Sequence, residues 1–427
     1  MRVWLIKIGE PLPVVDGPSI RKMRMSLLAD QLVAAGHEVV WWASTFSHAK
    51  KAHRFPDDKV VDVSDSFQIR MMKALGYRRS RSPARIIDHC LLARRFARLA
   101  RRQERPDVIV SAMPTPGLSR AAGEYGRQFG VPVVVDIRDL WPDCYIEPAR
   151  GLKRALTWLA FRPMARALRK ACRLATAITG ISRPAVDWAV GYAGREPTAN
   201  DRVVPHGYTR RRPTDEQIER ARAFWADRGI ADEPGRFIAC FFGYFGADYD
   251  IESVIEAARI LQADGLPMTL ALCGEGDRLA SYRELAREVP GVVLPGWVGF
   301  PEIWTMMEMA SVGLAPYVTR WSFRRTITNK PIEYLSGSLP LVSCLEGVVA
   351  DLIAEHDCGI TYRVGDPAGL ADALRRLHED RDRLARMSDN ARALYEQQFV
   401  GEKVYGEMVG LLERLAASAA RADRSGR

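Results

Sequence analysis

Two successive series of short apolar segments, separated by amphipathic helical patterns, constrain the fold of this chain more than any other feature. The first series is Val3–Ile8, Glu38–Ala43, Val108–Ser111, Val131–Asp136, Ala177–Gly180 and Arg202–Val204, and the second is Phe237–Tyr244, Met268–Cys273, Val292–Pro295, Val312–Ala315, Pro340–Ser343 and Gly359–Tyr362. Strands that alternate with helices form parallel sheets that are covered on both faces. The sequence therefore predicts an α/β protein with two doubly wound domains in series.

The predicted domain boundary lies near His206, because residues 207–213 are polar and end in a proline. We expect one domain at 1–206 and a second at 207–400, with a terminal helix at 403–420 that packs back on the first. A chain of 427 residues that is 47% hydrophobic is long enough for two cores. It has no apolar run of 18 residues, so no spanning helix is expected.

The seven cysteines are scattered singly and form no C-x-x-C pair. This pattern suggests neither a zinc site nor a disulfide framework. A reducing cytosol is the simplest compartment for such a chain.

The net charge of +10 is concentrated in two windows. Arg78–Arg105 carries ten arginines against two acidic residues, and Arg150–Arg173 carries eight basic residues and no acid. In the second window Arg162, Arg166 and Arg169 fall at helical spacing, opposite an apolar face. A basic amphipathic helix is typical of binding to a membrane surface.

The first window repeats this pattern, with its arginines expected opposite Ile87, Cys90, Leu91 and Phe96. We therefore expect an anionic membrane surface as a partner through Arg78–Arg105 and Arg150–Arg173. The alternative is a domain helix that packs its apolar side inward and leaves its basic side in solvent. Nucleic acid is not expected, because stacking aromatic residues are not interleaved with the basic ones.

The segment that begins at Asn329 combines a charged helix start with a buried strand. Lys330 and Glu333 share a helix face, and a turn with Gly337 precedes the apolar Pro340–Ser343. The first turn of a helix presents free N–H groups that suit phosphate, and Lys330 adds a full charge. Glu333 can accept two ribose hydroxyls. The segment indicates a site for a nucleoside diphosphate, and the alternative is a surface helix that merely carries a Lys and a Glu.

Glycines follow several predicted strands, at the end of the sheet where ligands bind to open α/β folds. Gly17 follows the first strand, Gly243 and Gly246 follow the first strand of the second domain, and Gly274 follows the next. Their corresponding positions in both halves suggest a cleft between two facing domains.

Together these segments resemble a retaining glycosyltransferase of family 4, with the GT-B fold of two Rossmann-like domains that face a cleft. The resemblance covers nearly the whole chain and rests on Gly36–Val39, Asp136–Pro142, Leu272–Gly276 and Lys330–Tyr334. The segment Asp136–Pro142 is typical of the bacterial branch that builds surface polysaccharides, and it resembles fucosamine-type transferases there.

The resemblance implies roles for the donor-binding residues. Glu333 matches the second Glu of the family's Glu-x7-Glu motif and would hold the donor ribose, with Lys330 near the diphosphate. Gly17 would let the backbone approach that diphosphate, and Trp297 and Val298 would hold the nucleobase through backbone contacts. The full expected donor-binding set is Gly17, Arg21, Gly243, Gly246, Gly274, Trp297, Val298, Arg325, Asn329, Lys330 and Glu333.

The chain departs from the family at three places. Arg325 stands where the family has its first Glu, which touches the donor sugar. The Arg and Lys that follow the first strand of the second domain are absent, so Lys330 is expected to neutralise the diphosphate, with Arg324, Arg325 and Arg21 in reserve. The family's His after the third strand is also absent, and its role is expected to pass to Arg138 or Asp139.

The expected catalytic residues are Asp136, Arg138, Asp139 and Lys330. In a retaining transfer the acceptor hydroxyl attacks from the face of the leaving diphosphate, which takes the proton, so positive charge matters more than a protein base. Asp136 and Asp139 would hold hydroxyls and Arg138 would pair with phosphate. For Asp139 the alternative is a helix N-cap or a buried pair with Arg138.

We expect neither a cofactor, other than the nucleotide-sugar substrate, nor a metal, since no Asp-x-Asp motif is recognised at a suitable strand end. The predicted protein is a peripheral enzyme on the inner face of a bacterial cytoplasmic membrane. It would move a hexosyl-type sugar to a lipid-linked or saccharide acceptor during capsule, exopolysaccharide or O-antigen assembly.

Two alternative functions remain open, and one is excluded. A sugar-nucleotide epimerase or hydrolase of the same fold would need acids, bases and usually histidines around the anomeric carbon. A degenerate, non-catalytic membrane scaffold fits the missing Glu. A dinucleotide oxidoreductase is excluded because no G-x-G-x-x-G stands at the first turn.

Overall fold

The computed structural model describes residues 1–17, 20–80, 82–231, 233, 235–266 and 268–425. Arg81, one arginine of the first basic window, lies outside the described residues. The chain divides into two compact units. Unit 1 comprises Met1–Pro205 and Gly401–Arg427, and unit 2 comprises His206–Val400.

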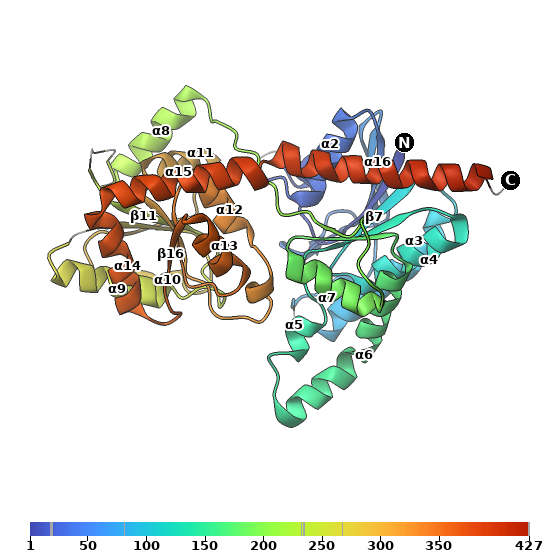
Figure 1. The fold of residues 1–427 in the computed structure, drawn as a ribbon, viewed down its shortest axis with the longest axis horizontal. Coiled ribbons are helices and arrows are strands. Elements are labelled where there is room, and N and C mark those ends of the chain that lie inside the picture. Colours follow the sequence, from blue (N-terminus) through green and yellow to red (C-terminus); the bar gives the residue numbers. More distant parts are fainter. Residues whose placement is uncertain (18–19, 81, 232, 234, 267, 426–427) are drawn as a thin grey trace. The chain divides into compact units, whose positions relative to one another are not determined.

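Unit 1 is built on a sheet with the strand order β10-β9-β8-β7-β1-β2-β6-β5. Figure 1 labels one of its central strands, β7. Its strands are β1 (Arg2–Ile6), β2 (Glu38–Ser44), β5 (Lys59–Ser64), β6 (Phe67–Met72), β7 (Val108–Ala112), β8 (Val133–Ile137), β9 (Ala177–Gly180) and β10 (Arg202–Val203). Neighbouring strands are parallel, except that β5 runs antiparallel to β6. A short antiparallel hairpin follows β2 in the chain and consists of β3 (Phe46–Ser47) and β4 (Ala52–His53).

The helices of unit 1 cover both faces of this sheet. They are α1 (Pro13–Asp16), α2 (Arg24–Ala34), α3 (Pro83–Ala100), α4 (Pro116–Phe129), α5 (Asp143–Ile146), α6 (Gly151–Leu174), α7 (Arg183–Ala193) and α16 (Gly401–Ser425). Along β1, Val3 and Leu5 enter a core with α2 and α16, whereas Trp4 and Ile6 enter a core with α3 and α4. Burial on both faces explains why residues 3–6 of β1 are continuously apolar.

Unit 2 has a parallel sheet with the order β13-β12-β11-β14-β15-β16. Its strands are β11 (Ile238–Phe242), β12 (Thr269–Cys273), β13 (Val292–Gly296), β14 (Val312–Ala315), β15 (Leu341–Ser343) and β16 (Gly359–Thr361). Its helices are α8 (Asp215–Ala226), α9 (Ile251–Ala263), α10 (Leu279–Ala286), α11 (Phe300–Met309), α12 (Asn329–Ser336), α13 (Val348–His356), α14 (Pro367–Glu379) and α15 (Arg381–Gln398), with a 3-10 turn η1 at Phe323–Arg325. Alternate residues of β11 again enter two cores, one with α9 and α14 and one with α11, α12 and α15.

The predicted class, α/β with two doubly wound domains, is confirmed, and every predicted strand is present. Within the described residues four strands were not predicted: β3 and β4, of two residues each, and β5 and β6. The segment Lys59–Ser64 is largely exposed and polar at the sheet edge, and β6 carries Arg70 inside it, so neither has the apolar run of a central strand.

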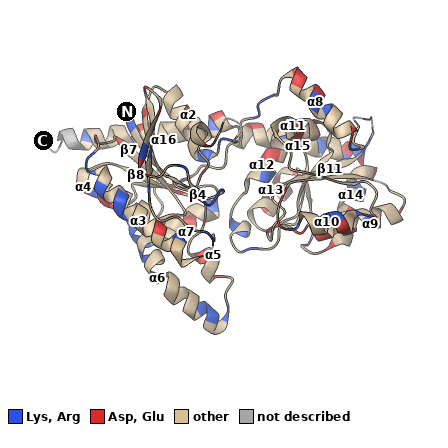
Figure 2. Cartoon of the chain, turned by 180° about the vertical axis from the view of Figure 1, so that it is seen from behind, with Lys and Arg blue, Asp and Glu red and all other residues tan. Residues whose placement is uncertain are grey.

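The expected apolar face of α3 is partly wrong. Ile87 and Cys90 are exposed, whereas the helix buries Asp88, Leu92, Ala93, Phe96 and Ala100. The acidic Asp88 belongs to the buried face because its carboxylate accepts the N–H of Gly76 at 2.7 Å. Arginine positions recur along α3, and Figure 2 marks Lys and Arg positions in blue on the ribbon.

Candidate functional site

The predicted helix at Asn329 is present as α12, Asn329–Ser336, and leads into β15. Lys330 is half-buried, and Glu333, one turn later, is only 7% exposed. Within the described residues the N-cap, Thr328, makes no side-chain bond to the helix, and its hydroxyl meets the hydroxyl of Tyr317 at 2.7 Å. The first turn of α12 is thus left without a side-chain cap, and its N–H groups and dipole favour an anion.

The ammonium group of Lys330 is fixed beside the end of β11. Its Nζ donates to the hydroxyl of Tyr249 at 2.8 Å and lies 4.7 Å from the centroid of that ring and 5.7 Å from that of Phe241. A Cβ added to Gly243 would lie 2.8 Å from Cε of Lys330. Glycine at 243 therefore leaves the space that the lysine stem occupies.

The loops after β11 and β12 approach each other through their backbones. A Cβ on Gly274 would lie 1.7 Å from the carbonyl oxygen of Gly243, and Gly274 has a φ of +153°. Two residues further along the same loop, a Cβ on Gly276 would lie 2.4 Å from the carbonyl oxygen of Phe245. Only glycine fits these positions, because the obstacles are backbone atoms that cannot rotate away. The structure thus brings Gly243, Gly274 and Lys330 together.

The other donor-side residues of unit 2 have different surroundings. Trp297, directly after β13, is 68% exposed, and Val298 is buried. The space beside Gly246 is filled by the ring of Tyr244, 2.9 Å from an added Cβ. The guanidinium group of Arg325 lies 4.2 Å from the ring centroid of Trp321 and donates to the carbonyl of Trp321 at 3.2 Å. Arg325 is therefore folded against its own turn.

One Asp-x-Asp triplet, Asp248–Asp250, lies in the loop between β11 and α9. Both of its carboxylates are engaged: Asp248 pairs with Arg320, and Asp250 caps α9 by accepting from the N–H of Ser253 at 3.2 Å and from its hydroxyl at 2.7 Å. Across the described part of the chain, no group of three or more His, Cys, Asp or Glu side chains could hold a metal ion.

In unit 1, Asp136 at the end of β8 is the centre of a buried ion network. Arg24 donates to both of its oxygens, at 2.9 and 3.0 Å, Arg138 donates to Oδ2 at 2.8 Å, and Thr179 donates to Oδ1 at 2.8 Å. Arg138 also pairs with Glu10 at 2.8 Å. Burial alone would raise the pKa of Asp136, but the two guanidinium groups outweigh it and hold that pKa well below its usual range.

This network leaves Asp136 without capacity for a substrate. Its side chain is 0% exposed, and its two oxygens together accept four hydrogen bonds, about the most that a carboxylate accepts. The expectation that Asp136 holds a substrate hydroxyl does not fit this geometry. Asp136 and Arg138 instead hold together the end of β8, the start of α2 through Arg24, and the loop after β1 through Glu10.

Asp139, three residues later, is exposed and lines a cavity of about 160 Å³ in unit 1. It does not cap a helix, because α5 begins at Asp143 with Pro142 as its N-cap, and Arg138 pairs with Asp136 and Glu10. The polar side chains that share this cavity with Asp139 are Lys7, Ser44, His48, Tyr77, Arg85, Asp88, His89 and Thr115.

Of these polar cavity residues only Asp139 was predicted as a site residue from the sequence, and three of the others have lowered pKa values. Burial, followed by the charge of Arg138, lowers the pKa of Lys7 to about 8. Burial and nearby cations also lower the pKa of His48 to about 4 and that of His89 to about 3, so both imidazoles are neutral at pH 7. Lys7 had a signal, because it is a lone cation inside the apolar run Val3–Ile8. His48 and His89 come from segments far apart in sequence, and nothing local marks them.

Gly17 and Arg21 also lie in unit 1. Gly17 ends α1 with a φ of +128°, which explains why glycine stands there, and its N–H donates to the carbonyl of Pro13 at 3.1 Å. Arg21 is exposed.

None of the helices in the described ranges is long and apolar enough to cross a membrane.

Two family models match the chain. A glycosyl transferase 4-like domain matches residues 22–233, and a model described as glycosyl transferases group 1 matches residues 236–380. Among characterised sequences, glycogen synthase of Acidiphilium cryptum is 28% identical over 184 residues, which are 40% of this chain and 38% of that relative. The match thus spans well under half of the relative's length.

Solved structures resemble nearly the whole chain. Sucrose-phosphate synthase from Thermosynechococcus elongatus has a TM-score of 0.70 at 15% identity, covering 98% of this chain and 99% of that one. The Anabaena protein Alr3699/HepE in complex with UDP has a TM-score of 0.63 at 15% identity, covering 97% of this chain and 100% of that one. At this level of identity the likeness establishes the fold.

Proposed function

Since the chain belongs to the glycosyltransferases with the GT-B fold, we propose that it transfers a sugar from a nucleoside-diphosphate sugar to a lipid-linked or saccharide acceptor with retention. One observation carries the proposal: the uncapped first turn of α12, with Lys330 and Glu333, lies against the glycine loops that end β11 and β12. That arrangement offers one cation, N–H groups and a carboxylate to a nucleotide.

On the donor side, Glu333 would accept the ribose hydroxyls and Lys330, with the α12 N–H groups beside it, would hold the diphosphate. Gly274 would keep the backbone close enough for this contact. The UDP complex of a structure with the same fold supports a nucleotide in this role. Asn329, Gly246, Trp297, Val298, Arg325, Gly17 and Arg21 remain proposed donor contacts, and of these Arg325 would first have to leave Trp321.

The reaction would be metal-independent. As the anomeric C–O bond breaks, the diphosphate gains charge, and Lys330 and the α12 N-terminus would stabilise it. The departing diphosphate would take the acceptor's proton, so a protein base is not required. We assign Asp139 to the acceptor hydroxyl, while Asp136 and Arg138 act as positioning residues that hold its loop.

The acceptor would enter through the cavity around Asp139 in unit 1. Its lining of Lys7, Arg85 and neutral imidazoles suits hydroxyl-rich or phosphorylated groups. Together with the basic window Arg150–Arg173, this favours a lipid-linked acceptor at the inner face of a bacterial membrane, during assembly of a surface polysaccharide such as lipopolysaccharide. The transferred group would be a hexosyl-type sugar.

Two alternative functions are each favoured by one specific observation. Arg325 in place of the family's first Glu favours a non-catalytic scaffold, and the histidines His48 and His89 favour a sugar-nucleotide epimerase or hydrolase. Release of free sugar or of an epimer without any acceptor would support the second. Nucleotide binding without turnover in a native lipid extract would support the first.

Thermal stabilisation by nucleotides tests the proposal. We expect one of UDP, GDP and TDP to raise the melting temperature by several degrees when present at about 100 times its Kd, since such an excess stabilises by roughly 2.7 kcal/mol. Glu333→Ala and the isosteric Glu333→Gln should lose this shift. Glu346→Ala should keep it, because Glu346 is an exposed carboxylate that pairs with Arg324.

If neither these nucleotides nor CMP, NAD or ATP stabilise the protein, the scaffold becomes the better proposal. If the shift persists in both Glu333 variants, the ribose assignment is wrong while the transferase proposal survives.

A further inference from the structure

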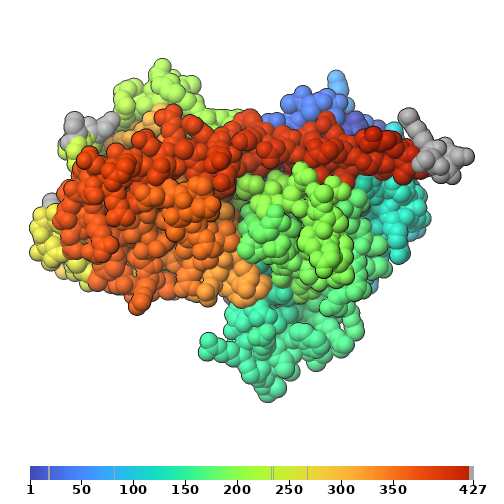
Figure 3. Space-filling model, viewed as in Figure 1, coloured from blue at the N-terminus to red at the C-terminus, as the bar shows by residue number. Residues whose placement is uncertain are grey.

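The first half of α6 stands away from the rest of unit 1 (Figure 3). Residues 151–160 are exposed on every side except at the half-buried Thr157, and the first fully buried residue of the helix is Leu168. A helix in water normally hides one apolar stripe. The exposure of this half therefore indicates that another surface covers it.

The exposed half carries an apolar ridge. Leu152, Leu156 and Leu159 are spaced at i, i+4 and i+7 and are 76%, 59% and 58% exposed. This spacing places them on one face of the helix, and Trp158 beside them is 50% exposed. Isolated exposed leucines are ordinary, but a ridge of three on a projecting helix is a binding surface.

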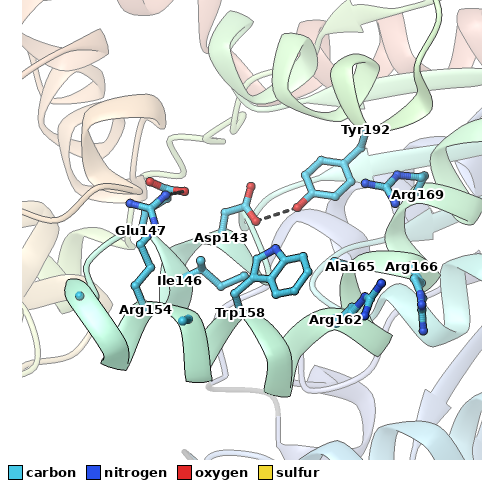
Figure 4. Close-up of a pocket in the computed structure, with 12 residues that line it drawn as sticks. Asp143, Ile146, Glu147, Arg154, Trp158, Arg162, Ala165, Arg166, Arg169 and Tyr192 are labelled. Carbon is cyan, nitrogen blue, oxygen red and sulfur yellow. Dashed lines mark hydrogen bonds and ion pairs between the residues drawn. The ribbon is translucent and has the colours of Figure 1, made fainter.

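A groove of about 890 Å³ runs along another face of α6 (Figure 4). Arg162, Arg166 and Arg169 line it from α6, again at i, i+4 and i+7, and α5 and α7 contribute Asp143 and Tyr192 on the opposite side. The two faces, ridge and groove, lie roughly a quarter of a turn apart around the helix axis.

The groove carries net positive charge, because three arginines of α6 face Asp143 as the one described lining carboxylate outside an ion pair. Asp143 accepts hydrogen bonds from the hydroxyl of Tyr192 and from the indole N–H of Trp188, each at 2.7 Å. Glu147 pairs with Arg154 at 3.0 Å. Among the residues that the structure describes, no carboxylate pairs with the three groove arginines, and Arg162 lies over the Trp158 ring at 5.3 Å.

These features together select one kind of partner. Guanidinium groups bind phosphate through paired hydrogen bonds. A soluble phosphate compound would leave the leucine ridge unexplained, and an uncharged membrane would leave the arginines unexplained. A second copy of this chain would bring a groove of the same charge. An anionic bilayer satisfies both faces, because leucines enter the acyl boundary while arginines meet headgroup phosphates.

A row of aromatic rings connects this helix with the cavity around Asp139. Phe161 of α6 stacks on Tyr145 at 5.1 Å, Tyr145 meets Trp141 at 5.1 Å, and Trp141 stacks on His89, a cavity residue, at 6.3 Å. The rings tie the projecting helix to the cavity wall, so a bilayer bound at α6 would hold the cavity at a defined place relative to the headgroups.

We propose that the groove of α5, α6 and α7 binds a phosphate of an anionic lipid headgroup while the Leu152–Leu156–Leu159 ridge enters the bilayer. The proposal rests on the proposed lipid-linked acceptor and assigns the docking to α6 rather than to the basic side of α3. The groove is a lipid site, separate from the nucleotide site of unit 2.

Vesicle co-sedimentation tests this site, with phosphatidylcholine vesicles that either contain or lack phosphatidylglycerol. One basic residue at an anionic surface strengthens binding about fivefold, so losing three should weaken partitioning by on the order of 100-fold. We expect this loss in a triple variant with Arg162→Gln, Arg166→Gln and Arg169→Gln. A second triple variant, with Leu152→Ser, Leu156→Ser and Leu159→Ser, should lose binding at least tenfold.

A matched control removes three exposed charges at comparable spacing from α3 and the turn that follows it, with Arg94→Gln, Arg98→Gln and Arg102→Gln. It should keep binding within about fivefold. The site is refuted if the groove variant sediments like the unmodified protein, or if the control loses as much. Tight calorimetric binding of glycerol 3-phosphate would also overturn the bilayer assignment and make the groove a soluble-phosphate site.

Each variant is also melted with the stabilising nucleotide. An unchanged melting temperature shows that the exposed substitutions leave the fold intact, and an unchanged nucleotide shift shows an intact donor site. Loss of the nucleotide shift in all proteins would reject the proposed function, while the vesicle results would still decide the lipid site.

Discussion

Replacing Asp136 with asparagine removes a negative charge from between two buried guanidinium groups. The side chains of Arg24 and Arg138 are only 3% and 8% exposed, so neither charge gains compensation from water. The new amide nitrogen would also face guanidinium donors where a carboxylate oxygen accepted hydrogen bonds. Breaking a buried ion pair on one side costs about 3–5 kcal/mol.

For a unit of this size, each kcal/mol lowers the melting temperature by roughly 2–4 °C, so Asp136→Asn should lower it by roughly 6–20 °C. Scanning calorimetry is the suitable assay, because the two units can melt in separate transitions. Asp139→Asn is the matched control. Its carboxylate is exposed, so its stability should change by no more than about 0.5 kcal/mol while acceptor-dependent activity falls.

The pH dependence supplies a second signature. Because the pKa of Asp136 is depressed in the folded state, its contribution to stability is complete above about pH 5 and is lost as the pH falls toward the folded pKa. The gap between the unmodified protein and Asp136→Asn should therefore narrow from pH 5 to pH 3. A variant that melts within about 2 °C of the unmodified protein at pH 7, or a gap that does not change with pH, would refute the reasoning.

Two further predictions concern unit 2. Gly274→Ala should lower the free energy of unfolding, measured in urea, by about 1–3 kcal/mol, because its methyl group would overlap the carbonyl of Gly243. The control Gly191→Ala, in open space on α7, should change that free energy little. A Gly274→Ala variant as stable as the unmodified protein would contradict the close approach of the two loops. Lys330→Gln should weaken nucleotide binding roughly 10- to 100-fold by calorimetry, the value of a charge-assisted hydrogen bond. Tyr249→Phe removes only the hydroxyl that Lys330 contacts and should weaken binding less; equal Kd values for Lys330→Gln and the unmodified protein would exclude Lys330 from the donor site.

The fold could be predicted because its strands obey a simple rule. Central parallel strands such as β1 and β11 are buried on both faces, so they appear as continuous apolar runs that need no knowledge of tertiary contacts. Edge strands escape the rule, and β5 was missed because one side of it faces solvent. The expected apolar side of α3 failed for a related reason, since a buried Asp88 cannot be distinguished from an exposed one without its partner, the N–H of Gly76.

The candidate site was predictable where its chemistry is local. Lys330 and Glu333 share one helix, so their spacing alone places them together. The function of Asp136 depends on Arg24, more than a hundred residues away, and the sequence contains no sign that the two side chains meet. The cavity residues His48 and His89 are likewise assembled only by the sheet topology. The site residues that were predicted are neighbours in sequence, and those that were not predicted depend on contacts between distant segments.

The position of α16 in the chain has a consequence for biosynthesis. Its side chains, including Val404, Tyr405, Met408 and Leu412, complete one of the two cores of unit 1, yet they leave the ribosome after all of unit 2. Unit 2 is one uninterrupted stretch, His206–Val400, and can finish folding during synthesis. Unit 1 must wait, with the apolar surface beside α2 uncovered, until the last helix emerges. We expect the nascent chain to be most prone to aggregation, and most dependent on chaperones, during that interval.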